Sequence, residues 1–278
     1  LERRTGNRFR FLYHPGLIYE HMDLRHDHVA LGDRRVRQAL LMATDRAQIT
    51  ERLFGGRQPV AHTSVNPLDP MHDPQVRQWP FDLARARALL EEAGWTPGPD
   101  GIRRNAAGER RSLEFMTTAG NRAREQVQQV LQGMWRQAGI EARIRNEPPR
   151  VFFAETLSRR RFQGLALFAW ISAPESVPRS SLHSDEIPRE ERNWSGQNYG
   201  GFRNAEMDVL THTIPEQLDA AQRREMWRRL QAIYAEELPA IPLWFRSDAH
   251  VWPQWLDGVR PTGHLNASPL WAEEWRVR

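Results

Sequence analysis

The sequence contains no cysteine and no lysine, and each absence limits what the chain can do. Without cysteine there is no disulfide, no thiolate nucleophile and no cysteine-ligated zinc or iron–sulfur site. Without lysine, all 39 basic residues are arginines, which raises the pI to 10.2 although the formal net charge is only +4. The 35 acidic residues are interspersed among them, so the charge pattern does not predict a nucleic-acid-binding surface.

Long apolar runs and a leader pattern are absent as well. The mean hydropathy is −0.70, and no apolar stretch approaches the roughly 18 residues that a spanning helix needs. The first residues lack the charged, apolar and small-residue regions of a signal peptide, which fits a cytoplasmic protein, a mature form or an excised fragment. With 278 residues, 40% of them hydrophobic, the chain can bury a core in one or two domains.

The periodicity of apolar residues predicts an α/β fold with a mixed sheet and flanking helices. Helical spacing appears at 33–44, 45–54, 82–93, 121–138, 151–158, 204–213 and 218–236. Alternating or continuous apolar residues predict strands at 8–13, 113–117, 140–146, 165–170 and 240–245. We expect the last four of these strands to lie in one sheet. The proline-rich loop at 57–80 is long enough to be functional or to wrap a surface.

Motifs of catalysis are missing: no glycine-rich phosphate loop follows a strand, and neither G-x-S-x-G nor H-E-x-x-H occurs. His21, His26 and His28 lie near two aspartates, but their irregular spacing favours a solvated polar turn over a metal site. The remaining inventory of aromatic, amide and guanidinium groups suits a binding protein, so we expect no enzyme activity, no metal and no cofactor.

The stretch NWSGQNYGGFRNAEMD at 193–208 is irregular, rich in glycine and asparagine, and contains three aromatic residues. Taken alone, it predicts a surface loop whose aromatic rings tuck into the nearest core. Together with other stretches of the chain, it suggests instead a segment that borders a ligand site.

Several stretches, in order, resemble the family 5 extracellular solute-binding proteins, the peptide-binding components of bacterial ABC importers. They are DRRVRQALLMATDRAQI at 33–49, FDLARARALLEEAGW at 81–95, MWRQAGIEARI at 134–144, LALFAW at 165–170, NYGGFRNAEMD at 198–208 and LQAIYAEELPAIPLWF at 230–245. The resemblance implies a periplasmic-binding-protein fold of type II, in which two lobes close on a peptide or a similar small solute. It also implies a location in the periplasm or on the extracellular face of the cell membrane, and permease subunits of an ABC transporter as partners. It predicts no nucleic-acid partner and no stable membrane insertion, although a lipid anchor on a preceding segment is compatible with it.

The same resemblance makes this chain the C-terminal portion of such a protein. Residues 1–30 would be a first-lobe or hinge segment, 31–246 the second, ligand-binding lobe, and 247–278 a return segment to the first lobe. The strand at 8–13 and the tryptophan-rich tail would then lack packing partners, and would pair with each other or with a second copy. The alternative is a ligand-sensing lobe of a regulator or signalling protein, which the segment preceding the chain would distinguish.

The resemblance also implies a ligand site around the end of the strand at 165–170. Trp170 and Tyr199 would wall the pocket, and Asn198 would offer a donor and an acceptor together. Family members commonly have an aspartate just after the strand-end tryptophan that pairs with the peptide ammonium, but Glu175 is the one acid at 171–178. The expected ligand-binding residues, placed near the start of the helix at 121–138, are Trp170, Ser172, Glu175, Asn198, Tyr199 and Arg122, the last as a partner for a carboxylate.

Overall fold

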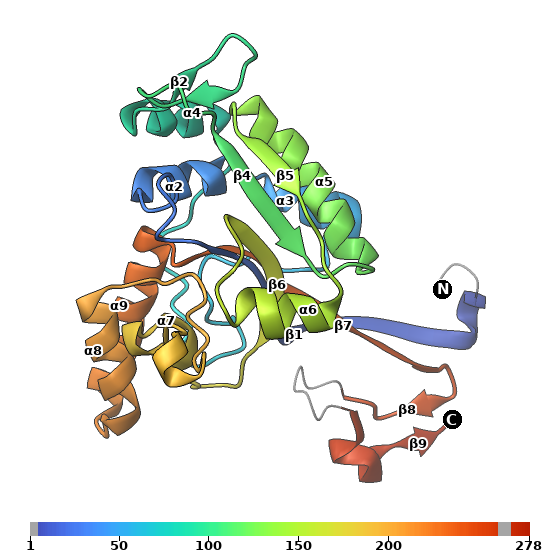
Figure 1. Ribbon diagram of the computed structural model, residues 1–278. Coiled ribbons are helices and arrows are strands. Elements are labelled where there is room, and N and C mark those ends of the chain that lie inside the picture. Colours follow the sequence, from blue (N-terminus) through green and yellow to red (C-terminus); the bar gives the residue numbers. More distant parts are fainter. Residues whose placement is uncertain (1–4, 261–267) are drawn as a thin grey trace.

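Five strands form the sheet at the centre of the computed structural model, which describes residues 5–260 and 268–278 (Figure 1). They are β1 (Phe9–Leu24), β4 (Ser112–Thr117), β5 (Glu141–Ile144), β6 (Leu165–Ile171) and β7 (Ala240–Pro253). Their order is β5-β4-β6-β1-β7. Strand β4 pairs in parallel with β5 and β6, whereas β1 is antiparallel to both β6 and β7, so the predicted mixed α/β sheet is confirmed.

Helices join and cover these strands, and each predicted helix is present within a few residues of its expected bounds. The helices are α2 (Arg34–Met42), α3 (Arg46–Phe54), α4 (Leu83–Glu92), α5 (Arg122–Gln137), α6 (Pro149–Val151), α7 (Arg179–Leu182), α8 (Ala205–Thr213) and α9 (Ala220–Glu237). Short turns of 3-10 or π helix are η1 (Gly6–Arg8), η2 (Phe152–Leu157), η3 (Ser184–Glu186), η4 (Glu190–Arg192), η5 (Ile214–Glu216) and η6 (Ser268–Glu274). Two small ribbons pair β2 (Thr96–Pro97) with β3 (Arg103–Arg104) and β8 (Leu256–Asp257) with β9 (Arg276–Val277).

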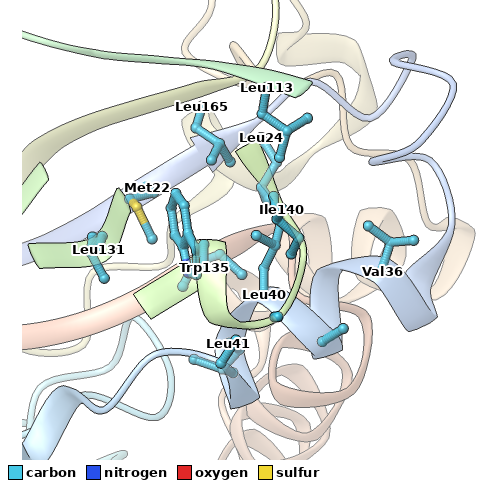
Figure 2. Packing of buried hydrophobic residues seen from close by; sticks show 14 of the residues in the cluster. Met22, Leu24, Val36, Leu40, Leu41, Leu113, Leu131, Trp135, Ile140 and Leu165 are labelled. Atoms are coloured by element: carbon cyan, nitrogen blue, oxygen red, sulfur yellow. The ribbon is translucent and has the colours of Figure 1, made fainter. Parts of the chain in front are cut away.

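The two faces of the sheet bury different clusters of side chains. On one face, Trp135 of α5 lies among Met22, Leu131 and Ile140, and its indole nitrogen donates to the hydroxyl of Thr44 at 2.9 Å (Figure 2). On the other face, aromatic rings from η2, β6 and the following loops form a second cluster: Phe152, Phe162, Phe168 and Tyr199. A third cluster centres on Trp227 and joins α7, α8 and α9. The second and third clusters border the candidate site.

Strand β1 is longer than the sequence analysis predicted, because it continues from the expected strand at 8–13 to Leu24. Residues 18–24 of β1 pair with β6, and residues 19–23 also pair with β7, in the middle of the sheet. Met22 and Leu24 are fully buried there. Glu20, His21 and Asp23 interrupt the apolar pattern of this stretch, which is why it does not read as a central strand. The central sheet therefore includes residues that precede position 31.

The first half of β1 and the second half of β7 leave this body together as a two-stranded ribbon (Figure 1). Phe9 pairs with Pro253 at its outer end, and the register shifts between Pro15 and Tyr19, where the ribbon meets the body. The strand at 8–13 and the beginning of the tail thus pair with each other, which is one of the two arrangements expected. Within the described residues, no helix is long and apolar enough to cross a membrane.

Candidate functional site

A cavity of about 150 Å³, here called the outer cavity, opens beside the carboxyl end of β6. Strands β4 and β6 are parallel and end toward the same edge, which is where ligands bind in open α/β sheets. Five parts of the chain contribute walls: β1, the loop at 64–69, the end of β6 with the segment after it, the loop at 193–202 and α9. The lining residues are Tyr19, Ser64, Val65, Asn66, Asp69, Trp170, Ile171, Ser172, Ala173, Ser176, Val177, Pro178, Ser180, Ser181, Gln197 and Trp227.

The proline-rich loop at 57–80 supplies one wall and is fixed in place by side-chain amides and carboxylates. The Asn66 side-chain amide donates to the carbonyl oxygen of Gly16 at 2.7 Å. Asp69 accepts from the backbone nitrogens of Met71 at 2.8 Å and Glu175 at 2.9 Å, which ties this loop to the segment after β6. The wall is therefore held by hydrogen bonds that are present without ligand.

Trp170 and Tyr199 are brought together, as expected. Their rings stack with centroids 6.1 Å apart and planes inclined by 25°. Tyr199 lies behind Trp170 with only 9% of its surface exposed, whereas Trp170 lines the cavity directly. Burial, and then the charge of Asp23, raise the pKa of Tyr199 to about 12, so its hydroxyl stays protonated at neutral pH.

The side chain of Asn198 makes its hydrogen bonds within the protein. Its nitrogen donates to the carbonyl oxygens of His183 at 3.1 Å and Phe202 at 2.9 Å, and its oxygen accepts from the backbone nitrogen of Phe202 at 2.9 Å. Both amide hydrogens are used, so Asn198 has no donor left for a ligand. These bonds instead shape the loop that positions Tyr199.

Ser172 lies where the sequence analysis placed it, whereas Glu175 does not. The hydroxyl of Ser172 lines the outer cavity and donates to the carbonyl oxygen of Leu17 at 3.3 Å. Glu175 has a left-handed backbone (φ 58) and turns its carboxylate toward Arg223, 3.3 Å away, beside a neighbouring hollow that shares Val177 and Trp227 with the outer cavity. Glu175 therefore lines that neighbouring hollow and not the outer cavity.

Arg122 also lies apart, because α5 packs on the face of the sheet opposite Trp170. It is exposed in the first turn of this helix. The neighbouring Arg124 does meet a carboxylate, but it is the protein's own. The buried Glu20 accepts from Arg124 at 3.1 and 3.2 Å and from Arg246 at 2.6 Å. This triad joins α5, β1 and β7 where the ribbon leaves the body.

A second, smaller space lies next to the outer cavity and is called the inner chamber below. Its volume is about 30 Å³. Its lining residues are Tyr19, His21, Asp23, Ser64, Trp170, Ser181, Leu182, Asn198, Gly200, Tyr234, Pro239 and Ala240. Because Tyr19, Ser64, Trp170 and Ser181 line both spaces, the inner chamber is contiguous with the outer cavity. Sequence reasoning missed Tyr19 and Asp23 here because it did not recognise the strand that carries them.

The three histidines near residue 25 do not converge on a metal. His21 is buried in β1, the ring of His26 lies 2.9 Å from the carbonyl oxygen of Pro239, and His28 accepts from the backbone nitrogen of Ala30. In the part of the chain that the structure describes, no group of three or more potential ligands could hold a metal ion. The expected solvated turn is also wrong for His21, which is only 1% exposed.

The fold and the cavity define a lobe of the periplasmic-binding-protein class, and comparison with known proteins gives the family. The sequence model described as bacterial extracellular solute-binding proteins, family 5 Middle, matches residues 3–185. Because this match covers more than half of the chain, the chain belongs to that family.

Individual relatives agree with this assignment. The chain is 25% identical over 258 residues to the oligopeptide-binding protein AppA of Bacillus subtilis, covering 91% of this chain and 46% of that protein. It is 26% identical over 248 residues to di/tripeptide-binding protein 2 of Pseudomonas aeruginosa, covering 86% of this chain and 42% of the relative. An oligopeptide-binding protein of Thermus thermophilus, solved with a pentapeptide, superposes with a TM-score of 0.85 at 37% identity, covering 94% of this chain and 47% of that one. The chain thus spans about half the length of these relatives, which are solute-binding proteins rather than regulators.

Proposed function

We propose that this chain forms one lobe of an extracytoplasmic binding protein that captures peptides for an ABC importer. The observation that carries the proposal is the outer cavity, in which Trp170 and Tyr19 present aromatic surface among serine, asparagine and glutamine side chains. A binding site of this composition takes up apolar and polar parts of a ligand together, through ring contacts and hydrogen bonds. Membership of family 5 and the peptide-binding relatives support the same ligand class.

The position of the cavity fits capture between two lobes. It lies at one edge of the sheet, and β1 and β7 continue from the body as the ribbon. A facing lobe would exclude water from the cavity, which strengthens each polar contact within it. The binding protein would then deliver the captured peptide to the permease subunits of the transporter at the outer face of the cell membrane.

Titration of the protein that contains this chain with a library of short peptides tests the ligand class. We expect Trp170→Ala to weaken peptide binding by about 1–3 kcal/mol, the range for losing a buried aromatic contact. Isothermal titration calorimetry gives the affinities, and mass spectrometry of ligand that co-purifies with the protein identifies its natural occupant.

Trp194→Ala is the matched control, because Trp194 lies on the loop at 193–202 and does not line the outer cavity. It should leave peptide affinity unchanged. Equal effects of the two substitutions, or no peptide binding by the wild-type protein, would contradict the proposed function.

A further inference from the structure

Four arginines are buried in the part of the chain that the structure describes, and Arg111 differs from the other three. Arg37, Arg46 and Arg103 each donate to backbone carbonyl oxygens. Arg111 is only 1% exposed, yet none of its three guanidinium nitrogens has a hydrogen-bond partner among the described residues. A buried charge is destabilising unless acceptors offset its lost hydration, so an acceptor from outside the chain would satisfy this group.

The surroundings of Arg111 supply an aromatic ring but no matching anion. Its Cζ atom lies 4.8 Å from the centroid of the Trp95 ring, which attracts the cation at one face of the guanidinium. The carboxylate whose charge reaches Arg111 is that of Asp33, but Asp33 accepts from the side chain of Arg35 at 2.7–3.2 Å. Burial lowers the pKa of Arg111 to about 9, so the guanidinium is charged at neutral pH. Its nitrogens therefore remain available to an oxyanion.

Arg111 borders a surface hollow, here called the edge hollow, beside the start of β4. Its lining residues are His28, Val29, Ala30, Trp95, Glu109, Arg110, Arg111 and Ser112. The start of β4 is the strand end drawn near α4 and β2 in Figure 1, whereas the outer cavity lies beside the carboxyl end of the parallel strand β6. The guanidinium nitrogens are covered in this structure, and the exposed side chains of Val29 and Arg110 are parts of the wall that can move aside for a ligand.

Two further donors belong to residues that line the edge hollow. The hydroxyl of Ser112 is buried and has no hydrogen-bond partner among the described residues. The Nδ1 atom of His28 accepts from the backbone nitrogen of Ala30 at 3.1 Å, so a neutral ring carries its proton on Nε2, which is then a donor. Burial, and then the charge of Arg111, hold the pKa of His28 below its ordinary value, so the ring is neutral at pH 7. The hollow thus combines several donors with one unpaired positive charge.

The charges around the edge hollow favour a ligand with a single negative charge. Arg110 is already paired with two carboxylates of the protein, at 2.6 and 3.1 Å. Glu109 also lines the hollow, and its negative charge opposes a second charge on the ligand. A carboxylate carries one charge and presents two acceptor oxygens in the plane that a guanidinium recognises. It therefore matches the hollow better than a phosphate dianion does.

We propose that the edge hollow is a second ligand site, which binds the carboxylate of a small organic acid through the guanidinium of Arg111, with Ser112 and His28 as further donors. Because the guanidinium is covered, a small free acid reaches it more easily than an acidic side chain on a docking protein. The site is separate from the outer cavity and does not depend on the proposed function. Its ligand would supply the anion that the buried Arg111 lacks, so binding should stabilise the folded protein.

Thermal unfolding of the protein that contains this chain, in acetate and in chloride at equal ionic strength, tests the site. We expect acetate at roughly ten times its dissociation constant to raise the melting temperature by about 2–5 °C relative to chloride, because it binds only the folded state. Phosphate at the same ionic strength should stabilise the protein less than acetate.

Arg111→Met removes the charge and retains an apolar side chain. We expect it to raise the acetate concentration needed for the same stabilisation by at least about tenfold, because the charged partner of the carboxylate is lost. In chloride this variant should melt at a higher temperature than the wild type, since it buries no uncompensated charge.

Arg228→Met is the matched control, because the Arg228 side chain is 56% exposed and lies outside the edge hollow. It should keep the full response to acetate. If Arg111→Met fails to fold, Ser112→Ala decides the matter, because loss of one donor should raise the acetate concentration needed by at least about threefold.

Three results would overturn the proposal. Acetate and chloride stabilise the wild-type protein equally, which would leave water as the partner of Arg111. Phosphate stabilises the protein more than acetate, which would exclude a carboxylate as the preferred ligand. Arg111→Met, or Ser112→Ala in its place, keeps the wild-type response, which would place the acetate effect elsewhere. The peptide titration described above tests the proposed function separately, and none of these results changes its outcome.

Discussion

At the scale of single residues, a buried arginine connects separate segments of the backbone. Arg46 is only 4% exposed and donates to the backbone oxygens of Ala61, Trp79 and Pro242. Burial lowers the pKa of Arg46 to about 10, which still leaves it charged at neutral pH. A planar guanidinium with several donors can join backbone segments that no side-chain pair connects. Arg46 therefore links α3 to the proline-rich loop and β7.

His26 gives the folded protein a pH dependence. Burial, and then the charge of Arg37, lower the pKa of His26 from 6.5 to about 3, so the folded state holds this ring neutral. Below pH 6.5 the unfolded chain binds a proton at His26 that the folded chain does not. The stabilisation is thus complete above pH 6.5 and is lost as the pH falls toward 3, by about 1.4 kcal/mol per pH unit.

His26→Gln tests this, because glutamine retains a nitrogen donor for the carbonyl oxygen of Pro239 but does not titrate. Urea unfolding at pH 7.5 and pH 4.5 should show that the variant loses about 3 kcal/mol less stability than the wild type between the two values. His62, whose pKa burial lowers to about 4, remains in both proteins, so some pH dependence persists in the variant. Identical losses in the two proteins would exclude His26 as a source.

The ends of the helices were predictable from sequence because their signals are local. Asp45 and Asp82 stand at the N-terminal ends of α3 and α4 and accept from the backbone nitrogens of Gln48 and Arg85 at 2.8 Å each. Gly94 and Gly139, which follow α4 and α5, have φ of +84 and +81, the left-handed backbone that commonly ends a helix. Such signals lie within a few residues of the feature they specify.

The site was only partly predictable, because its residues come from distant parts of the chain. Trp170 and Ser172 follow a recognisable strand and were expected at the site, and both line the outer cavity. Tyr19 reaches that cavity only because β1 pairs with β6 in the register Tyr19↔Trp170. Such a long-range register has no local sequence signal. The polar residues Glu20, His21 and Asp23 also break the apolar pattern by which this part of β1 could have been predicted as a strand. The internal bonds of Asn198 likewise depend on residues that only the fold brings together.

The loop at 193–202 depends on close backbone contacts at its glycines. Gly196 has φ of +102, and a Cβ there would lie 2.1 Å from the carbonyl oxygen of Glu186. We expect Gly196→Ala to destabilise the protein by at least about 2 kcal/mol, because both the left-handed backbone and the clash oppose it. Chemical unfolding at neutral pH measures this effect.

Gly133 is the matched control for this loop substitution. It is exposed in the middle of α5, and nothing lies within 4 Å of a Cβ at that position. Gly133→Ala should therefore stabilise the protein by about 0.5–1 kcal/mol, since alanine loses less backbone entropy in a helix. Destabilisation at Gly133, or tolerance of alanine at Gly196, would contradict the packing described here.

At the scale of the whole molecule, the two halves of β1 differ in how well neighbouring elements stabilise them. Residues 20–24 of β1 are buried between β6 and β7, whereas residues 9–14 pair with β7 alone. Leu12, Val251 and Trp255 on or beside the ribbon are at least 40% exposed, so few apolar contacts support it.

Hydrogen exchange on this chain should reveal this gradient. We expect the hydrogen-bonded amides at 9–14 to exchange at least about tenfold faster than those at 20–24, because the ribbon opens without disturbing the core. Equal protection of both halves in a chain shown by sedimentation to be monomeric would mean that the ribbon has packing that the structure does not contain.

The ribbon also has a mechanical consequence. Phe9 and Pro253 stand opposite each other at its outer end, and β1 and β7 are antiparallel. A force that pulls these two residues apart acts across the strands and loads one cross-strand pair at a time, as in a zipper. The same two strands, pulled lengthwise in opposite directions, would load all their pairs at once. The ribbon therefore resists sliding of its strands more than it resists peeling.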